Sequence, residues 1–218
     1  MTWSEVFELL EVGLQETAWM VGVATVLTAI GGLFVGVLLV LTAPGGLLAV
    51  PALYGVLGLI VNVTRSVPFI ILLVAVIPFT RAVVGTTIGT DAAIVPLTIG
   101  AIPFFARIVE AALREVPSDV IAAATAMGAT RTQIVGKVLL REARPGLVAG
   151  LTITVIALVG YSAMAGVVGG GGLGDLAIRY GYQRFETEVM VATVAALVVF
   201  VQLVQMAGDL FVRRLSHR

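Results

Sequence analysis

Five stretches of the chain are long and apolar enough to cross a lipid bilayer, and they constrain the fold more than any other feature. A membrane-spanning helix needs about 20 mainly apolar residues. Only 12% of the residues are charged, whereas about a quarter are charged in a soluble domain. The sequence therefore predicts an all-α polytopic membrane protein with five spans at about 17–41, 52–79, 91–113, 146–168 and 189–210.

The basic residues are distributed unevenly along the chain, and their distribution predicts its orientation. Lys and Arg concentrate in the cytoplasmic segments of membrane proteins. No basic residue precedes Arg65, whereas the segment between the third and fourth spans and the C-terminal tail are both rich in them. We therefore predict that the N-terminus lies outside the membrane and that the C-terminus lies in the cytoplasm.

The polar segment 117–142 separates the third span from the fourth. Ser118 is suited to begin a helix, and Gly128 is suited to end one in the left-handed conformation. Thr130 and Gln133 form a capping-box pattern for a second helix. We therefore predict two short cytoplasmic helices that are joined at the glycine.

The first of these helices has mostly small side chains, in AAATAM (122–127). Small side chains let another backbone approach closely, but they hold a helix only weakly in lipid. One interpretation is a docking element for a cytoplasmic partner. The alternative is an interfacial elbow that lies on the lipid headgroups.

These residues resemble the cytoplasmic loop of ATP-binding-cassette (ABC) importer permeases. The loop pattern of that family is Glu-Ala-Ala, three residues, Gly, nine residues, and then Ile-x-Leu-Pro or a relative of it. Ala123, Ala124 and Gly128 match the pattern, and KVLLREARPG matches its end. Ala122 replaces the usual glutamate and Arg141 the usual proline, so the ion pair that this glutamate can make with the ATPase is missing.

Four further stretches are similar to the permeases of methionine importers within that family. They are NVTRSVPFIILLVAVIPFTR (62–81), AAIVPLTIGAIPFFAR (92–107), AMGATRTQIVGKVLL (126–140) and LVGYSAMAGVVGGGGLG (158–174). They agree in order and spacing, and the resemblance covers about 14–210, which would be one importer transmembrane domain.

The resemblance implies the partners and the mechanism. It implies a homodimer in a prokaryotic inner membrane, a cytoplasmic ABC ATPase dimer that hydrolyses ATP, an external methionine-binding lipoprotein, and transport by alternating access. It further implies that segment 117–142 couples the permease to the ATPase, through Ala122, Ala123, Ala124, Met127, Gly128, Arg131 and Lys137.

Arg65 is the main candidate for a charge inside a span. A central arginine costs about 2.5–3.5 kcal/mol on insertion scales, so its side chain should face protein or water. One interpretation is that Arg65 lines the substrate path. The alternative is that the second span begins near Ser66, which would leave Arg65 at the cytoplasmic edge.

A second candidate for the path is GYSAM (160–164) in the fourth span. Tyr161 and Ser162 offer hydroxyl groups, and Met164 is a flexible apolar side chain. By resemblance this stretch lines the central cavity, with Met164 as a gate. Plain helix packing is the alternative.

The sequence excludes several kinds of chemistry. There is no cysteine, and His217 is the single histidine. GGGGLG (169–174) contains G-x-G-x-x-G but follows a membrane helix instead of a strand, and no P-loop motif exists. We therefore expect no catalytic residue, metal, cofactor or nucleic acid. We expect these glycines to form a flexible outer loop where the external binding protein docks.

Two alternatives to a methionine importer remain open. One is an ABC importer permease for another small amino acid or solute. The other is a stand-alone channel or secondary carrier, which predicts internal repeats and ionisable residues in the spans. The sequence shows no convincing repeat.

Two spacings have simpler interpretations. Arg107, Glu110 and Arg114 lie on one helix face and can form ion pairs, which we interpret as a solvated extension of the third span. Gly32 and Gly36 form a G-x-x-x-G pattern that permits close helix packing, for which a contact between two copies of the chain is one option.

Overall fold

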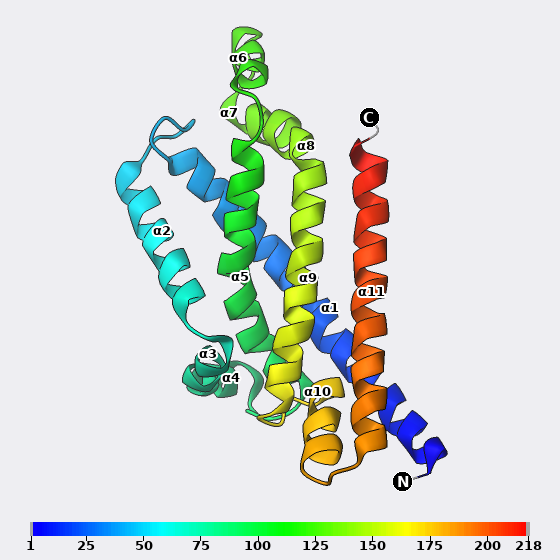
Figure 1. Ribbon diagram of the computed structural model, residues 1–218. Coiled ribbons are helices and arrows are strands. Elements are labelled where there is room, and N and C mark those ends of the chain that lie inside the picture. Colours follow the sequence, from blue (N-terminus) through cyan, green and yellow to red (C-terminus); the bar gives the residue numbers. More distant parts are fainter. Residues whose placement is uncertain (1, 217–218) are drawn as a thin grey trace.

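The predicted all-α class is confirmed. The computed structural model describes residues 2–216, and its regular structure in that range is entirely helical. The single histidine, His217, lies outside the described residues. The elements, labelled in Figure 1, are α1 Trp3–Thr42, α2 Pro51–Ser66, α3 Phe69–Ala75, α4 Ile77–Val84, α5 Thr90–Arg114, α6 Ser118–Ala126, α7 Arg131–Gln133, η1 Ile134–Leu139, α8 Leu140–Glu142, α9 Arg144–Gly166, α10 Gly172–Leu176, η2 Ala177–Tyr182 and α11 Thr187–Ser216.

Four of the described helices are long and apolar enough to cross a membrane: α1, α5, α9 and α11. Figure 1 shows that α1 begins at the end of the bundle opposite to α6, whereas α11 finishes at the same end as α6. The helix α1 starts at Trp3, well before the predicted position 17. Thr2 and Glu5 form a capping box there, which satisfies free backbone groups of the first turn.

The second predicted span, 52–79, is not one straight helix. It corresponds to α2, α3 and the beginning of α4, and the axes of α2 and α3 differ by 105°. Pro68 explains the break, because proline has no N–H group and disfavours a helical conformation in the preceding residue. Val67 is accordingly extended, with φ −81° and ψ 125°. Counted as one span, the bent pair gives a total of five.

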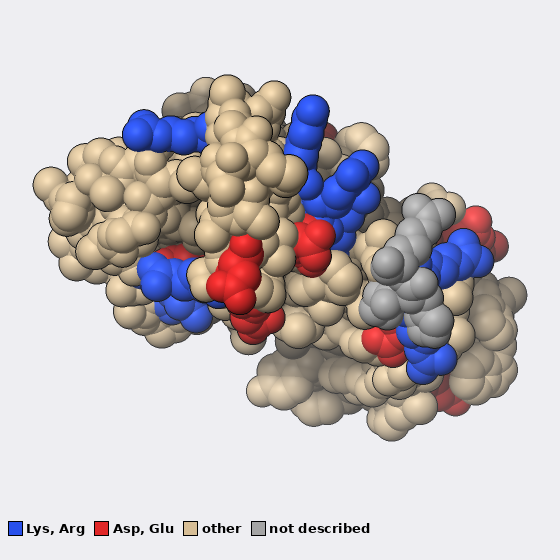
Figure 2. Space-filling model, turned by 90° about the horizontal axis from the view of Figure 1, so that it is seen from above, with Lys and Arg blue, Asp and Glu red and all other residues tan. Residues whose placement is uncertain are grey.

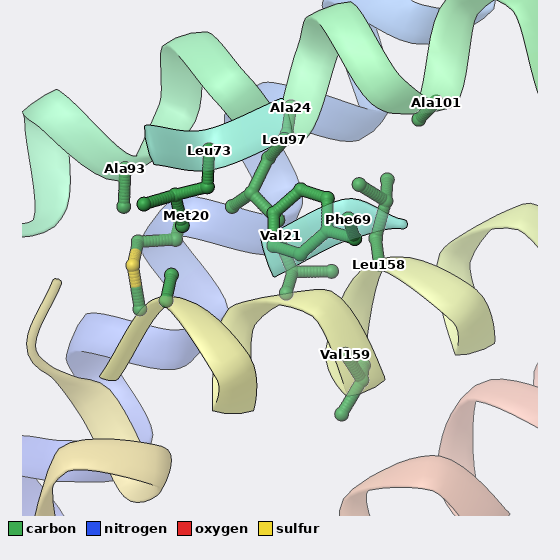
Figure 3. Close-up of a cluster of buried hydrophobic side chains, with 11 residues drawn as sticks. Met20, Val21, Ala24, Phe69, Leu73, Ala93, Leu97, Ala101, Leu158 and Val159 are labelled. Atoms are coloured by element: carbon green, nitrogen blue, oxygen red, sulfur yellow. The ribbon is translucent and has the colours of Figure 1, made fainter. Parts of the chain in front are cut away.

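The main core lies where α1, α3, α5 and α9 meet (Figure 3). Met20 of α1, Leu97 of α5 and Leu158 of α9 are completely buried there, and Phe69 of α3 is 8% exposed. Burying one such side chain stabilises the fold by about 1.5–3 kcal/mol. This cluster fixes α3 against α9, although the chain is broken just before α3.

The glycines of the G-x-x-x-G pattern join two helices of the same chain. A Cβ atom on Gly32 would lie 2.8 Å from Phe105 of α5, and one on Gly36 would lie 2.5 Å from Val109. Larger residues would therefore push α1 away from α5, at a cost of about 1–3 kcal/mol. The close packing predicted from the pattern is present, and it lies between α1 and α5 instead of between two copies of the chain.

Candidate transport path and coupling surface

The position of Arg65 in its helix bears on the two interpretations of this residue. The helix α2 begins at Pro51, so Arg65 lies 14 residues further on, about 21 Å along the helix at 1.5 Å per residue. The helix that contains Arg65 therefore does not begin near Ser66, which is the last residue of α2. Arg65 lies at the break between α2 and α3.

An open cavity of about 250 Å³ lies at this break. Arg65 lines it from α2, Phe69 from α3, Phe104 from α5 and Tyr161 from α9. Phe69 and Tyr161 stack, with ring centroids 4.5 Å apart and planes 8° from parallel. The structure thus brings together two of the predicted path residues, Arg65 and Tyr161, from distant parts of the sequence.

The other two predicted path residues lie elsewhere. Ser162 is 1% exposed, and its hydroxyl donates to the carbonyl of Val159 at 2.8 Å. Its side chain is therefore part of the helix packing and does not line the cavity. Met164 is 47% exposed near the end of α9 and is not among the cavity residues.

The predicted coupling segment stands beyond the ends of α5 and α9 (Figure 1). Ala122, Ala123 and Gly128 are exposed, and Met127 is 82% exposed. Ala124 is buried. Hence four of these five residues can contact a partner, while Ala124 fixes α6 to the rest of the protein.

The local conformations predicted for this segment are confirmed. Gly128 has φ +78° with open space around it. This is the left-handed conformation in which helices often end. The hydroxyl of Thr130 accepts from the Gln133 N–H, and the Gln133 side chain accepts from the Thr130 N–H. Arg131 and Lys137 are exposed. Figure 2 looks onto this end and shows basic and acidic side chains gathered on it.

A buried cluster attaches the coupling segment to the membrane helices. It contains Leu113 and Val116 at the end of α5, Ala124 of α6, and Ile134 and Leu139 of η1. Packed interiors transmit displacements because they deform little. A force on α6 would therefore reach α5.

The sequence interpretation of Glu110 as a solvated residue is wrong. Its carboxylate is buried and accepts from Arg107 at 2.6 Å and from Arg114 at 2.7 Å. The hydroxyl of Tyr54 in α2 donates to it at 3.2 Å, and Arg107 also donates to the side chain of Asn62 at 2.9 Å. The predicted ion pairs form, but α2 covers them. Only tertiary packing brings Tyr54 and Asn62 here, so no local pattern could reveal the network.

The glycine-rich segment is not the exposed flexible loop that the sequence suggested. Gly172 and Leu173 are buried, and their N–H groups donate to Glu16 at 2.6 Å and to Thr17 at 2.9 Å, both in α1. Gly172 has φ +77°, and a Cβ atom there would lie 2.6 Å from the Thr17 hydroxyl. Glycine is needed because the backbone passes directly against α1.

Comparison with known proteins defines the class to which this fold and surface belong. Residues 30–218 match the family described as binding-protein-dependent transport system inner membrane component. The chain belongs to this family. It is therefore a membrane-embedded component of a transport system, and the alternative of a stand-alone channel or carrier is wrong.

The most specific likeness is to permeases of methionine transport systems. The chain is 50% identical to the probable D-methionine transport system permease protein MetI of Pasteurella multocida, over 98% of both chains. It is 60% identical to the protein with the same description from Vibrio cholerae, over 74% of this chain and 72% of that one. Its fold matches a chain of the inward-facing MetNI methionine ABC transporter with a TM-score of 0.96, at 53% identity over 99% of both chains. The resemblance predicted from the sequence is confirmed.

Proposed function

We propose that this chain is the permease subunit of an ATP-driven importer of methionine. The observation that carries the proposal is the agreement with the MetNI structure over 99% of both chains at 53% identity. Fold similarity alone would not indicate a substrate, but here the similarity of fold is accompanied by 53% sequence identity over 99% of both chains. The subunit provides the path, and its partners provide the energy.

The path is formed by two copies of the chain around a two-fold axis, which is the usual symmetry of a homodimer. The helices α2 and α3 have much exposed apolar surface, including Leu59, Ile60 and Ile71, for contact with lipid and with the second copy. Tyr161 and Arg65 face the path, and Met164 acts as a gate near the outer end of α9. The two copies alternate between inward-facing and outward-facing states.

The cytoplasmic partner is an ABC ATPase dimer that docks on the exposed residues of α6 and the following turn. In this chain Ala122 provides no carboxylate, so docking depends on the shape around Ala123, Met127 and Gly128, aided by the basic residues Arg131 and Lys137. The buried cluster below α6 transmits the movement of the ATPase to α5, as in other rigid-body transitions.

The outer partner is a substrate-binding lipoprotein, and the N-terminus lies on its side of the membrane. The family description, a binding-protein-dependent system, supports such a partner. The concentration of Lys and Arg in 114–144 and 213–218 supports a cytoplasmic location for α6 and the C-terminus.

Reconstitution tests the proposal directly. The purified permease is inserted into liposomes with its ATPase and binding protein, and uptake of radiolabelled L- and D-methionine is measured with and without ATP. We expect ATP-dependent uptake of at least one of the two. Uptake of another amino acid, with neither form of methionine transported, would refute methionine as the substrate while leaving the family membership intact.

A further inference from the structure

We propose that the cavity at the break between α2 and α3 is an amino-acid binding site within each permease subunit. Arg65 binds the substrate carboxylate, and Phe69, Phe104 and Tyr161 receive its apolar side chain. The inference rests on the proposed function and extends it, since it names the group that recognises the substrate inside the membrane.

Arg65 has the free hydrogen-bonding capacity that such a site requires. Among residues 2–216, Arg65 forms no ion pair, and its guanidinium carbon lies 6.0 Å from the centroid of the Phe104 ring. A guanidinium that lies over a ring keeps its N–H groups free at its edge, in the planar fork that matches a carboxylate. In contrast, Arg107 on the next helix is occupied by Glu110 and Asn62.

The aromatic side chains form an apolar wall next to this charge. Phe69 and Tyr161 stack, and Phe104, whose ring lies 6.0 Å from the Arg65 guanidinium carbon, lines the same cavity. A thioether sulfur interacts favourably with aromatic rings at about 5 Å. A cation beside an apolar wall suits an amino acid whose side chain is apolar and unbranched.

The place of the cavity in the fold also suits a substrate site. In secondary transporters, substrate sites typically lie at discontinuous helices inside the bilayer. Arg65 lies at such a break, about 21 Å along α2, which is less than the roughly 30 Å of a hydrocarbon core. Gly100 of α5 lines the same cavity. A Cβ atom there would lie 3.3 Å from Leu72 and 3.4 Å from Phe69, so the lack of a side chain keeps this wall open.

The test measures binding of radiolabelled methionine to the purified permease–ATPase complex without the binding protein, with the signal of the ATPase alone subtracted. Arg65→Gln removes the charge, Arg65→Lys keeps the charge but removes the fork, and Phe104→Leu changes the apolar wall. Arg81→Gln is the matched control, because Arg81 is exposed on α4 and does not line the cavity.

We expect Arg65→Gln to raise the Kd for methionine by about tenfold or more, because two charge-assisted hydrogen bonds are lost. Arg65→Lys and Phe104→Leu should each raise it by about threefold, and Arg81→Gln should leave it unchanged. Methioninol, which lacks the carboxylate, should fail to displace methionine from the wild-type complex. In proteoliposomes, Arg65→Gln should raise the KM for uptake by a similar factor.

A Kd and KM for Arg65→Gln within about twofold of the wild type would overturn the inference, as would displacement of methionine by methioninol at equal concentration. If Arg65→Gln does not assemble, Arg65→Lys and Phe104→Leu decide the question by the same criterion. Failure of the proposed function would give a different result, because the wild-type complex itself would then transport no methionine.

Discussion

Replacing Glu110 by glutamine should destabilise the permease strongly, because the carboxylate lies at the centre of a covered network. The side chains of Glu110 and Arg107 are 6% and 21% exposed, whereas that of Arg114 is 50% exposed. The substitution keeps the shape of the side chain but removes its charge. Arg107 then remains between α2 and α5 without a counter-ion.

The magnitude follows from the burial of each partner. Breaking a buried ion pair costs about 3–5 kcal/mol, while a half-exposed pair such as that of Arg114 contributes less than about 1 kcal/mol. Arg107 keeps its hydrogen bonds to Gly58 and Asn62, which places the loss near the lower bound, at about 3 kcal/mol. For a chain of this size the unfolding temperature should fall by about 6–12 °C.

Tryptophan fluorescence of the purified permease during heating measures this change. Tyr54→Phe provides a graded comparison: it removes one hydroxyl that donates to Glu110 at 3.2 Å and should cost about 1 kcal/mol. The double variant Arg107→Gln with Glu110→Gln should be more stable than Glu110→Gln alone, because the covered Arg107 charge is removed and the remaining Arg114 is half-exposed to solvent. An unfolding temperature for Glu110→Gln within about 1 °C of the wild type would refute the reasoning.

Three further outcomes are expected. Gly128→Glu should abolish co-purification with the ATPase, because it places a side chain at φ +78°, at a cost of about 1 kcal/mol or more, and puts a carboxylate into the contact. The Ala122→Glu variant should bind the ATPase normally. Normal stimulation of the ATPase by the Gly128→Glu variant would instead favour a lipid-facing elbow. A single cysteine at Ser4 should react with an impermeant reagent in intact cells and one at Ser216 should not; the reverse pattern would overturn the orientation. Met164→Ala should alter methionine transport or uncouple ATP hydrolysis while leaving the assembled complex intact, and unchanged coupling would argue against the gate.

The sequence was sufficient where the determining forces are local. Apolar runs of about 20 residues have to become membrane helices, because their backbone groups find no other partners in lipid. The cap at Thr130 and the left-handed Gly128 depend on a few neighbouring residues, so the coupling segment was predicted in detail. The break at Pro68 is equally local, although its angle of 105° depends on how α3 packs against α9.

The sequence was insufficient where contacts join distant segments. The periodicity of α5 shows that Glu110 can pair with Arg107 and Arg114, but only the approach of Tyr54 in α2 shows that the group is covered. The glycines at 169–174 look like a flexible loop until Glu16, more than 150 residues earlier, is found to bind their backbone.

The candidate site shows the same division. Arg65 and Tyr161 were singled out because a charge and a hydroxyl are unusual in apolar spans, which is a property of the sequence. That they line one cavity while Ser162 turns away to Val159 depends on the rotation of α9 and on the bend between α2 and α3. The rotation of α9 and the bend are set by the packing of Phe69, Leu97 and their neighbours in the core, because side-chain volumes decide how helices rotate against one another.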